Sequence, residues 1–301
     1  MKTDFSGILL INKPKGMTSH DVVGKVRRLY NTREVGHTGT LDPMATGLLV
    51  VLVGRAVKAS ELIVSDGKTY RAGLRLGITT DTEDVTGEVL TESDAIPSYE
   101  EVARVSAGFV GDIKQVPPMY SALKVGGVKL VDLARKGTTV EREARDVTVY
   151  SLELSRGESE RDYLFTASCS KGTYIRTLCA DIGRVLGCGG VMSSLERLKS
   201  GMFTLDQAYT LAELEGMELA DRIAILHPVE SVFADLEALR LPAFYEKLAK
   251  NGCEIYQKKL KCDYPLGKRF RMVDAEGFYA IGEVRDYPDG SAVKLIKRFR
   301  D

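Results

Sequence analysis

Runs and alternations of apolar residues predict the elements in the first third of the chain. Residues 7–12 and the apolar run 48–53 are typical of strands, and the second run is apolar enough to be buried. Between them, apolar residues recur at helical spacing behind Ser19, which can cap a helix. Residues 68–77 alternate between apolar and basic positions, which predicts a half-buried strand, and an acidic, threonine-rich loop follows at 79–87.

The middle of the chain continues this mixture of helices and strands. Ser98 and Glu101 form a capping-box pattern at the start of one predicted helix, and Gly187 is typical of the end of another. Strands outnumber helices without a regular βαβ alternation, so the sequence favours an α+β fold. The predicted segments are helices at 98–109 and 173–187 and strands near 147–154 and 163–169.

Two changes in residue composition along the chain predict how it is divided into domains. Residues 115–145 contain Pro-Pro, Gly-Gly and six Lys/Arg residues, which indicates an excursion from the core, either a basic hairpin or a helix-containing insert. After an acidic helical stretch, the last sixty residues change to short β-like segments separated by turns. We therefore expect two domains, residues 1–239 and residues 240–301.

Charge and composition narrow the classes of protein. The chain has 42 basic and 42 acidic residues, but residues 240–301 hold 14 Lys/Arg against 9 Asp/Glu, which hints at an anionic partner. The five cysteines form no Cys-x-x-Cys pair and only three histidines are present, so we expect neither a disulfide framework nor a metal site. We also expect no membrane span and no secretory signal, and hence a cytoplasmic protein.

The most informative segment is residues 37–49, in which a single carboxylate, Asp42, lies among small, turn-forming and apolar residues. Pro43 biases Asp42 toward an extended backbone. Gly39 and Gly47 allow a tight turn or the close approach of another backbone. Since a buried strand is predicted directly afterwards, the segment presents an acid at the edge of a core, which is typical of a catalytic carboxylate.

Several chemistries could use such an acid. A glycosidase needs two opposed carboxylates, and no obvious second one lies near Asp42. In aspartyl-phosphate enzymes the nucleophilic aspartate precedes a Lys-Thr-Gly-Thr sequence, and Gly36 occupies that position here. No phosphate-binding or dinucleotide motif occurs in a supporting context. The remaining set, one acid with nearby histidine, basic and aromatic residues, suits chemistry on a flipped nucleotide.

Five motifs carry a resemblance to a known family, the bacterial tRNA pseudouridine-55 synthases, or TruB family. They stand in the family's order, and the resemblance extends from residue 7 to about residue 205, with weaker agreement to the end. The motifs are Lys13-Pro14-Lys15-Gly16-Met17-Thr18-Ser19, Gly36-His37-Thr38-Gly39-Thr40-Leu41-Asp42-Pro43, Lys68-Thr69-Tyr70-Arg71, Val116-Pro117-Pro118-Met119-Tyr120-Ser121-Ala122 and Cys169-Ser170-Lys171-Gly172-Thr173-Tyr174-Ile175-Arg176.

The resemblance implies a fold, an activity and a partner. The fold would be a pseudouridine-synthase catalytic core, with a mixed, largely antiparallel sheet flanked by helices, and a small C-terminal β-barrel-like PUA domain. The activity would convert uridine 55 in the TΨC loop of tRNA to pseudouridine, by detaching the base, rotating it and reattaching it through C5. This reaction requires no cofactor. We expect tRNA as the partner, no protein partner and a monomer, and the basic insert would grip the RNA.

The resemblance also implies roles for individual catalytic residues. Asp42 would be the essential carboxylate, and whether it attacks the sugar or the base, or abstracts a ribose proton, is left open. Arg176 would pair with Asp42 and hold it ionised, although an isolated arginine more often forms a surface ion pair. Tyr174 would lie near C5 of the base. Taken without the resemblance, Tyr174 is equally an aromatic residue at a helix start packed on the core.

The expected binding residues surround the same base. Tyr70 would stack on the flipped uracil, although an apolar strand face also suits a core tyrosine. His37 would insert into the RNA loop, unless it only bonds its own turn. Lys13 and Pro14 would support the cleft, by stabilising it or by contacting the ligand. Leu195 would line the uridine pocket, and the family's arginine beside it is replaced here by Glu196.

Two other functions compete with this one. A non-catalytic RNA-binding protein or tRNA-folding chaperone would keep the pocket only as a docking site, although it would not need the four residues Asp42, Tyr70, Tyr174 and Arg176 together. A hydrolase acting on nucleosides would release free uracil instead of an isomer.

Overall fold

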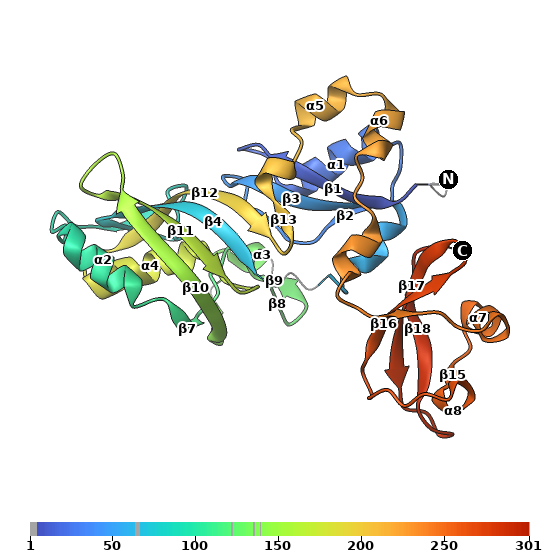
Figure 1. The fold of residues 1–301 in the computed structure, drawn as a ribbon. Coiled ribbons are helices and arrows are strands. Elements are labelled where there is room, and N and C mark those ends of the chain that lie inside the picture. Colours follow the sequence, from blue (N-terminus) through green and yellow to red (C-terminus); the bar gives the residue numbers. More distant parts are fainter. Residues whose placement is uncertain (1–4, 64–66, 122, 135, 139, 301) are drawn as a thin grey trace.

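The computed structural model describes residues 5–63, 67–121, 123–134, 136–138 and 140–300, which form one large and one smaller β-sheet with helices on their faces (Figure 1). Two short hairpins make up the other sheets. The expected α+β class is therefore observed. No helix among these residues is both long enough and apolar enough to cross a membrane.

The large sheet has nine strands and carries the Asp42 segment near its centre. Every pairing in it is antiparallel except that between β12 and β3, where Glu196 lies opposite Thr46 and Arg197 opposite Gly47. The expected mixed, largely antiparallel sheet is thereby confirmed. In sheet order the strands are β1 (Gly7–Lys13), β3 (Thr46–Val53), β12 (Gly190–Ser200), β4 (Lys68–Leu76), β11 (Asp162–Cys169), β10 (Arg145–Arg156) and β7 (Gly111–Gln115), with β2 (Val35–His37) on β3 and β13 (Phe203–Thr204) on β12.

Helices pack on the sheet through separate apolar clusters. Helices α2 (Tyr99–Ala107) and α4 (Ile175–Leu186) share one cluster with the inward side chains of β4 and β11. Helix α1 (Ser19–Leu29) and the short helix α5 (Leu211–Gly216) share another with β1 and β3. The alternation predicted for residues 68–77 is confirmed, since Tyr70, Ala72, Leu74 and Leu76 are buried whereas Arg71 and Arg75 are exposed.

The cap of α1 differs from the prediction. Thr18, and not Ser19, is the N-cap: its hydroxyl accepts from the Asp21 amide, and the Asp21 carboxylate accepts from the Thr18 amide. The Ser19 hydroxyl instead accepts from the Leu41 amide at 2.8 Å and lies 3.1 Å from the Leu41 carbonyl. The residue expected to begin the helix therefore ties it to the residue before Asp42.

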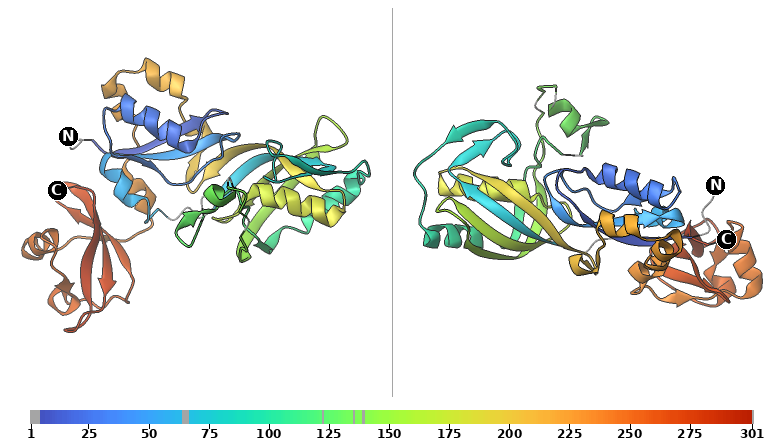
Figure 2. Two further views of the ribbon diagram at one scale, coloured as in Figure 1. Left: turned by 180° about the vertical axis from the view of Figure 1, so that it is seen from behind. Right: turned by 90° about the horizontal axis from the view of Figure 1, so that it is seen from above.

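The predicted insert contains both a hairpin and a helix. Strands β8 (Lys124–Val125) and β9 (Val128–Lys129) are followed by α3 (Leu130–Ala134), and the right panel of Figure 2 shows this segment standing away from the large sheet. Arg135, one of the basic residues of the insert, lies outside the described residues. The acidic loop belongs to a second hairpin, β5 (Ile78–Thr80) and β6 (Val89–Glu92).

The C-terminal sheet has five strands and its own apolar core. It begins at Ala238, two residues before the predicted boundary, and its described strands form an open series with no pairing between the first and the last. Ile281 and Phe299 from this part join an apolar cluster with Phe233 of the preceding chain. In sheet order the strands are β14 (Ala238–Leu239), β16 (Arg269–Asp274), β17 (Gly277–Arg285), β18 (Ala292–Arg298) and β15 (Ile255–Tyr256), accompanied by α7 (Ala243–Lys250) and α8 (Gln257–Leu260).

Short helices connect the two sheets and complete the architecture. Three of them lie in the chain between the two sheets, where His227 pairs with Ile8 of β1, and one 3₁₀ turn follows β3. These elements are η1 (Gly54–Ala59), η2 (Leu205–Gln207), α6 (Leu219–Ala224) and η3 (Val229–Phe233).

Candidate active site

The loop between β2 and β3 presents Asp42 at the edge of the core. Leu41 is buried, whereas 34% of the Asp42 side chain is exposed. The Ala45 amide donates to the Asp42 carbonyl at 3.1 Å, and the Gly16 amide donates to the Pro43 carbonyl at 2.8 Å. The turn after β1 therefore packs against the loop, and the carboxylate is held in a tight turn while it remains reachable.

Gly47 allows the neighbouring strand β12 to lie close to β3 directly after this loop. Its φ is +94°, and a Cβ there would lie 2.5 Å from the Arg197 carbonyl oxygen and 2.7 Å from the Arg197 amide nitrogen. A side chain at this position would strain the backbone and collide with β12. The only parallel pairing in the described part of the large sheet therefore depends on a glycine five residues after Asp42.

Asp42 and Arg176 form an ion pair with a Nε to Oδ2 distance of 3.1 Å. Arg176 lies in the first turn of α4, and only 7% of its side chain is exposed. Its guanidinium also donates to the Thr82 carbonyl at 3.2 Å and to the Tyr120 carbonyl at 2.8 Å. The sequence motifs that contain Asp42, Arg176 and Tyr120, far apart in the chain, thus meet at one guanidinium.

The acidic loop 79–87, to which the sequence analysis assigned no role, lies behind Arg176. Asp84 is buried, with one carboxylate oxygen 3.7 Å from the guanidinium and the other accepting from Thr82 and from Thr86. Glu83 has a φ of 62° and accepts from the Thr177 hydroxyl at 2.7 Å. These contacts attach the hairpin to the start of α4 and supply a second carboxylate to Arg176.

The groups around Asp42 shift its pKa in opposite directions. Burial raises the pKa of the Asp42 carboxyl above its ordinary value. The Arg176 guanidinium lowers this pKa, the Asp84 carboxylate raises it further, and the Lys13 ammonium lowers it. The net direction is upward, so proton uptake by this acid is easier than for an exposed aspartate.

Lys13 is fully buried beside the Asp42 loop. Its ammonium donates to the carbonyls of Met17 at 2.7 Å, Pro14 at 3.0 Å and Pro43 at 3.4 Å. Burial lowers the pKa of Lys13 to about 8, although Asp42 favours its charged form. Lys13 therefore fastens two turns to each other, and Pro14 contributes its carbonyl while its ring is exposed.

The expected base-binding residues divide into buried and reachable ones. Tyr70 and Leu195 are only 8% and 9% exposed and belong to one apolar cluster with Leu41. Tyr174 is half-buried at the N-cap of α4, where the buried Gln115 side chain bonds both its amide, at 3.0 Å, and its carbonyl, at 3.2 Å. The chain thus places an apolar wall near Asp42 and an aromatic residue two positions before Arg176.

His37 ends β2 and is half-buried. Its Nδ1 is enclosed and has no hydrogen-bond partner among the described residues. Burial lowers the pKa of His37 below its ordinary value, and the charges of Arg197 and His20 lower it further. Burial and these charges therefore favour the neutral imidazole.

Comparisons with known proteins match nearly the whole chain. Residues 27–175 match the N-terminal domain of TruB family pseudouridylate synthases, and residues 176–234 match the tRNA pseudouridylate synthase B C-terminal domain. The tRNA pseudouridine synthase B of Alkaliphilus oremlandii (strain OhILAs) is 44% identical over 93% of this chain and 94% of its own. That of Francisella tularensis subsp. tularensis (strain WY96-3418) is 43% identical over 94% of this chain and 92% of its own.

This chain belongs to the TruB family of pseudouridylate synthases. The family expected from the five motifs is confirmed. Among solved structures, a Cbf5–Nop10–Gar1 complex contains a similar chain, with a TM-score of 0.69 and 26% identity over 97% of this chain and 84% of that one. Among the described residues of this TruB-family chain, no cluster of three or more His, Cys, Asp or Glu side chains could hold a metal ion.

Arg197 is a site residue of this TruB-family protein that the sequence analysis missed. Only 1% of it is exposed, yet its guanidinium donates to the carbonyls of Leu48 at 2.7 Å and Gly39 at 3.1 Å. It also bonds the Tyr70 hydroxyl, which opposes the lowering of the pKa of Arg197 by burial. Since residues two apart in a strand share a face, an inward Leu195 already implied an inward Arg197.

Glu196, which replaces the family's arginine, lies on the opposite face of β12. It is paired in register with Arg71 of β4, and their side-chain charges are 3.5 Å apart. This departure from the family pattern therefore completes a cross-strand ion pair at the surface, on the face of β12 opposite to Leu195.

We predict that Arg197→Met destabilises the protein by about 3 kcal/mol or more, because two carbonyls and a hydroxyl lose a buried donor. Urea unfolding followed by circular dichroism measures this change. Arg71→Met is the matched control on the neighbouring strand, and as a surface ion-pair variant it should cost less than about 1 kcal/mol. Equal effects of the two substitutions would contradict the structural role of Arg197.

Proposed function

We propose that this TruB-family enzyme isomerises uridine 55 in the TΨC loop of tRNA to pseudouridine. The observation that carries the proposal is the Asp42–Arg176 ion pair, which holds one reachable carboxylate beside the apolar wall of Tyr70 and Leu195. The relatives that are 44% and 43% identical to this chain are tRNA pseudouridine synthases. The reaction is an isomerisation of one nucleotide, so its substrate must leave the base stack to reach Asp42.

The chemistry balances within the nucleotide. The bond between N1 and C1′ breaks, a bond between C5 and C1′ forms, and the proton lost from C5 is matched by one gained at N1. Asp42 acts in its ionised form, which the neighbouring Arg176 guanidinium favours. Tyr70 and Leu195 receive the uracil ring, and Tyr174 lies toward C5, where the proton leaves. His37 fills the space that the flipped base vacates in the RNA.

The rest of the chain grips the RNA. We assign catalysis to residues 1–239 and RNA binding to the basic insert at 115–145 and to residues 240–301, as a PUA-like domain whose sheet is open. Within the insert, Arg142 donates to the Pro117 carbonyl at 3.0 Å and joins its two ends, while Arg145 is exposed for a phosphate. The enzyme acts as a cytoplasmic monomer without a protein partner or cofactor.

Tritium at C5 of uridine in unmodified tRNA tests this function. Isomerisation releases tritium to water without free base, whereas a nucleoside hydrolase would release uracil and a chaperone would release neither. We predict that Asp42→Asn lowers tritium release to background while the Kd for tRNA changes less than about tenfold, because the amide keeps the shape of the side chain but cannot act as a carboxylate. Asp221→Asn, on the exposed surface of α6, is the control and should keep full activity. Substantial turnover by Asp42→Asn would remove Asp42 from its role.

The pH dependence of kcat tests how the neighbouring charges shift the pKa of Asp42. Activity requires the carboxylate, so it is lost as the pH falls through the pKa of Asp42. Because Asp84 raises that pKa, Asp84→Asn should move the acidic limb of kcat to lower pH, and the asparagine oxygen can still accept from Thr82 and Thr86. Asp94→Asn, at an exposed ion pair with Arg161, should leave the limb in place. A limb that stays fixed, or moves to higher pH, in Asp84→Asn would contradict this electrostatic account.

A further inference from the structure

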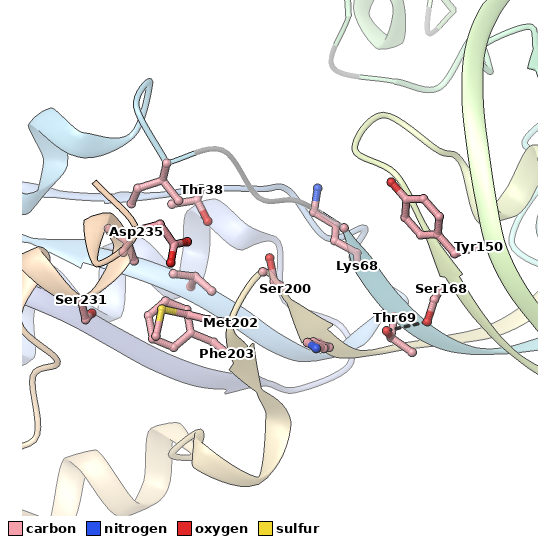
Figure 3. A pocket seen from close by; sticks show the side chains of 16 residues that line it. Thr38, Lys68, Thr69, Tyr150, Ser168, Ser200, Met202, Phe203, Ser231 and Asp235 are labelled. Carbon is pink, nitrogen blue, oxygen red and sulfur yellow. Dashed lines mark hydrogen bonds between the residues drawn. The ribbon is translucent and has the colours of Figure 1, made fainter. Parts of the chain in front are cut away.

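A separate cavity of about 360 Å³ adjoins the Asp42 loop. It lies between the ends of β4, β11 and β12 and the 3₁₀ turn η3, and Figure 3 shows the side chains that line it. Thr38 brings the loop of residues 37–49 to its wall, and Lys68 and Thr69 bring the start of β4. Its volume is within the range of small-ligand pockets, about 300–1,000 Å³. None of the residues assigned to uracil binding lines it.

Lys68 contributes an ammonium group to the wall of this cavity. Its side chain reaches Gly39, since a Cβ at Gly39 would lie 3.9 Å from the Lys68 ammonium nitrogen. In the described part of the chain the ammonium group has no ion pair and no hydrogen bond. Burial lowers the pKa of Lys68, and the charges of Arg197 and Lys171 lower it further. Asp235 lines the same cavity but forms no ion pair with Lys68 among the described residues, so the ammonium group is available to an anion.

Two exposed side chains of the cavity wall are suited to contact with a flat, partly polar ring. Tyr150 is 56% exposed on β10, and Met202 is 57% exposed above Phe203. In the view of Figure 3, Lys68 lies between Tyr150 on one side and Asp235 on the other. An exposed aromatic ring stacks on any nucleobase, and the carboxylate of Asp235 can accept from a base amino group while it repels a phosphate.

We propose that this cavity is a second nucleotide subsite, which takes a nucleotide adjacent to the target uridine, with its phosphate on Lys68 and its base against Tyr150. The proposal rests on the function proposed above, because a polynucleotide substrate provides the neighbouring nucleotide. Continuity supports the RNA strand as the source: Thr38 is four residues before Asp42, and Lys68 is two residues before Tyr70 on the same strand face.

Neutralised phosphates test the contact directly. TΨC stem-loop RNAs carry a methylphosphonate at one or the other phosphate flanking the target uridine, and their Kd values are measured with the full-length wild-type protein and Lys68→Met. We expect Lys68→Met to weaken binding of the unmodified RNA roughly ten- to a hundredfold, as for a lost charge-assisted hydrogen bond. The slope of log Kd against log salt should fall by about 1. One of the two methylphosphonates should weaken binding to the wild type and have no further effect on Lys68→Met.

Controls separate this proposal from general charge loss and from misfolding. Lys25→Met removes a charge of α1 that forms an exposed ion pair with Glu215, and this variant should respond to each methylphosphonate as the wild type does. Tyr150→Ala should raise KM with little change in kcat, whereas a merely structural residue would lower the folded fraction seen by circular dichroism. If Lys68→Met folds poorly, Lys68→Arg takes its place and should keep the dependence on the same phosphate.

Two results would overturn the subsite. One is additive losses from Lys68→Met and from each methylphosphonate, in a wild-type enzyme that releases tritium normally. The other is saturable, Lys68-dependent binding of free uridine 5′-monophosphate without any coupling to the flanking phosphates, which would assign the cavity to a free nucleotide and not to the RNA strand. Absence of tritium release by the wild type would instead count against the proposed function itself.

Discussion

The ion pair between Asp42 and Arg176 is the interaction on which the arrangement of the site depends. Asp42 belongs to the loop before β3, and Arg176 to the helix that packs on the other half of the sheet. A buried guanidinium is costly unless its donors are satisfied. The carbonyls of Thr82 and Tyr120 satisfy them, so the acidic hairpin and the start of the basic insert are fixed by the same side chain that orients the acid.

A second constraint is that two further buried cations hold the backbone of the Asp42 loop. Lys13 donates to the Pro43 carbonyl and Arg197 to the Gly39 carbonyl, one on each side of the carboxylate along the chain. Neither of these cations has a carboxylate within ion-pairing distance among the described residues. The Asp42 carboxylate therefore lies in positively charged, partly desolvated surroundings. The cations of these surroundings attract a polyanion, and they oppose the rise in the pKa of Asp42 that burial causes.

Local patterns predicted most of the fold, while contacts between distant segments were beyond them. The alternation in β4 and the apolar run of β3 follow directly from side-chain periodicity. The cap of α1 was placed one residue late, because a threonine and a serine are adjacent and only Thr18 has an acid at the third position beyond it. The acidic loop had no sequence signal for its role, since its partner Arg176 is some 90 residues away. Arg197 was missed although its spacing from Leu195 indicated burial.

The ionisation of Asp42 is the quantity that tests this account most directly. Carboxyl ¹³C NMR titration of the wild-type protein and of Arg176→Met, with Asp42→Asn to assign the resonance, reports its pKa. The account predicts a pKa above the ordinary aspartate value in the wild type, because burial is the largest influence, and a still higher pKa when the guanidinium is removed. A pKa of Asp42 that does not change, or that falls, in Arg176→Met would contradict the claim that this ion pair sets the charge of the catalytic acid.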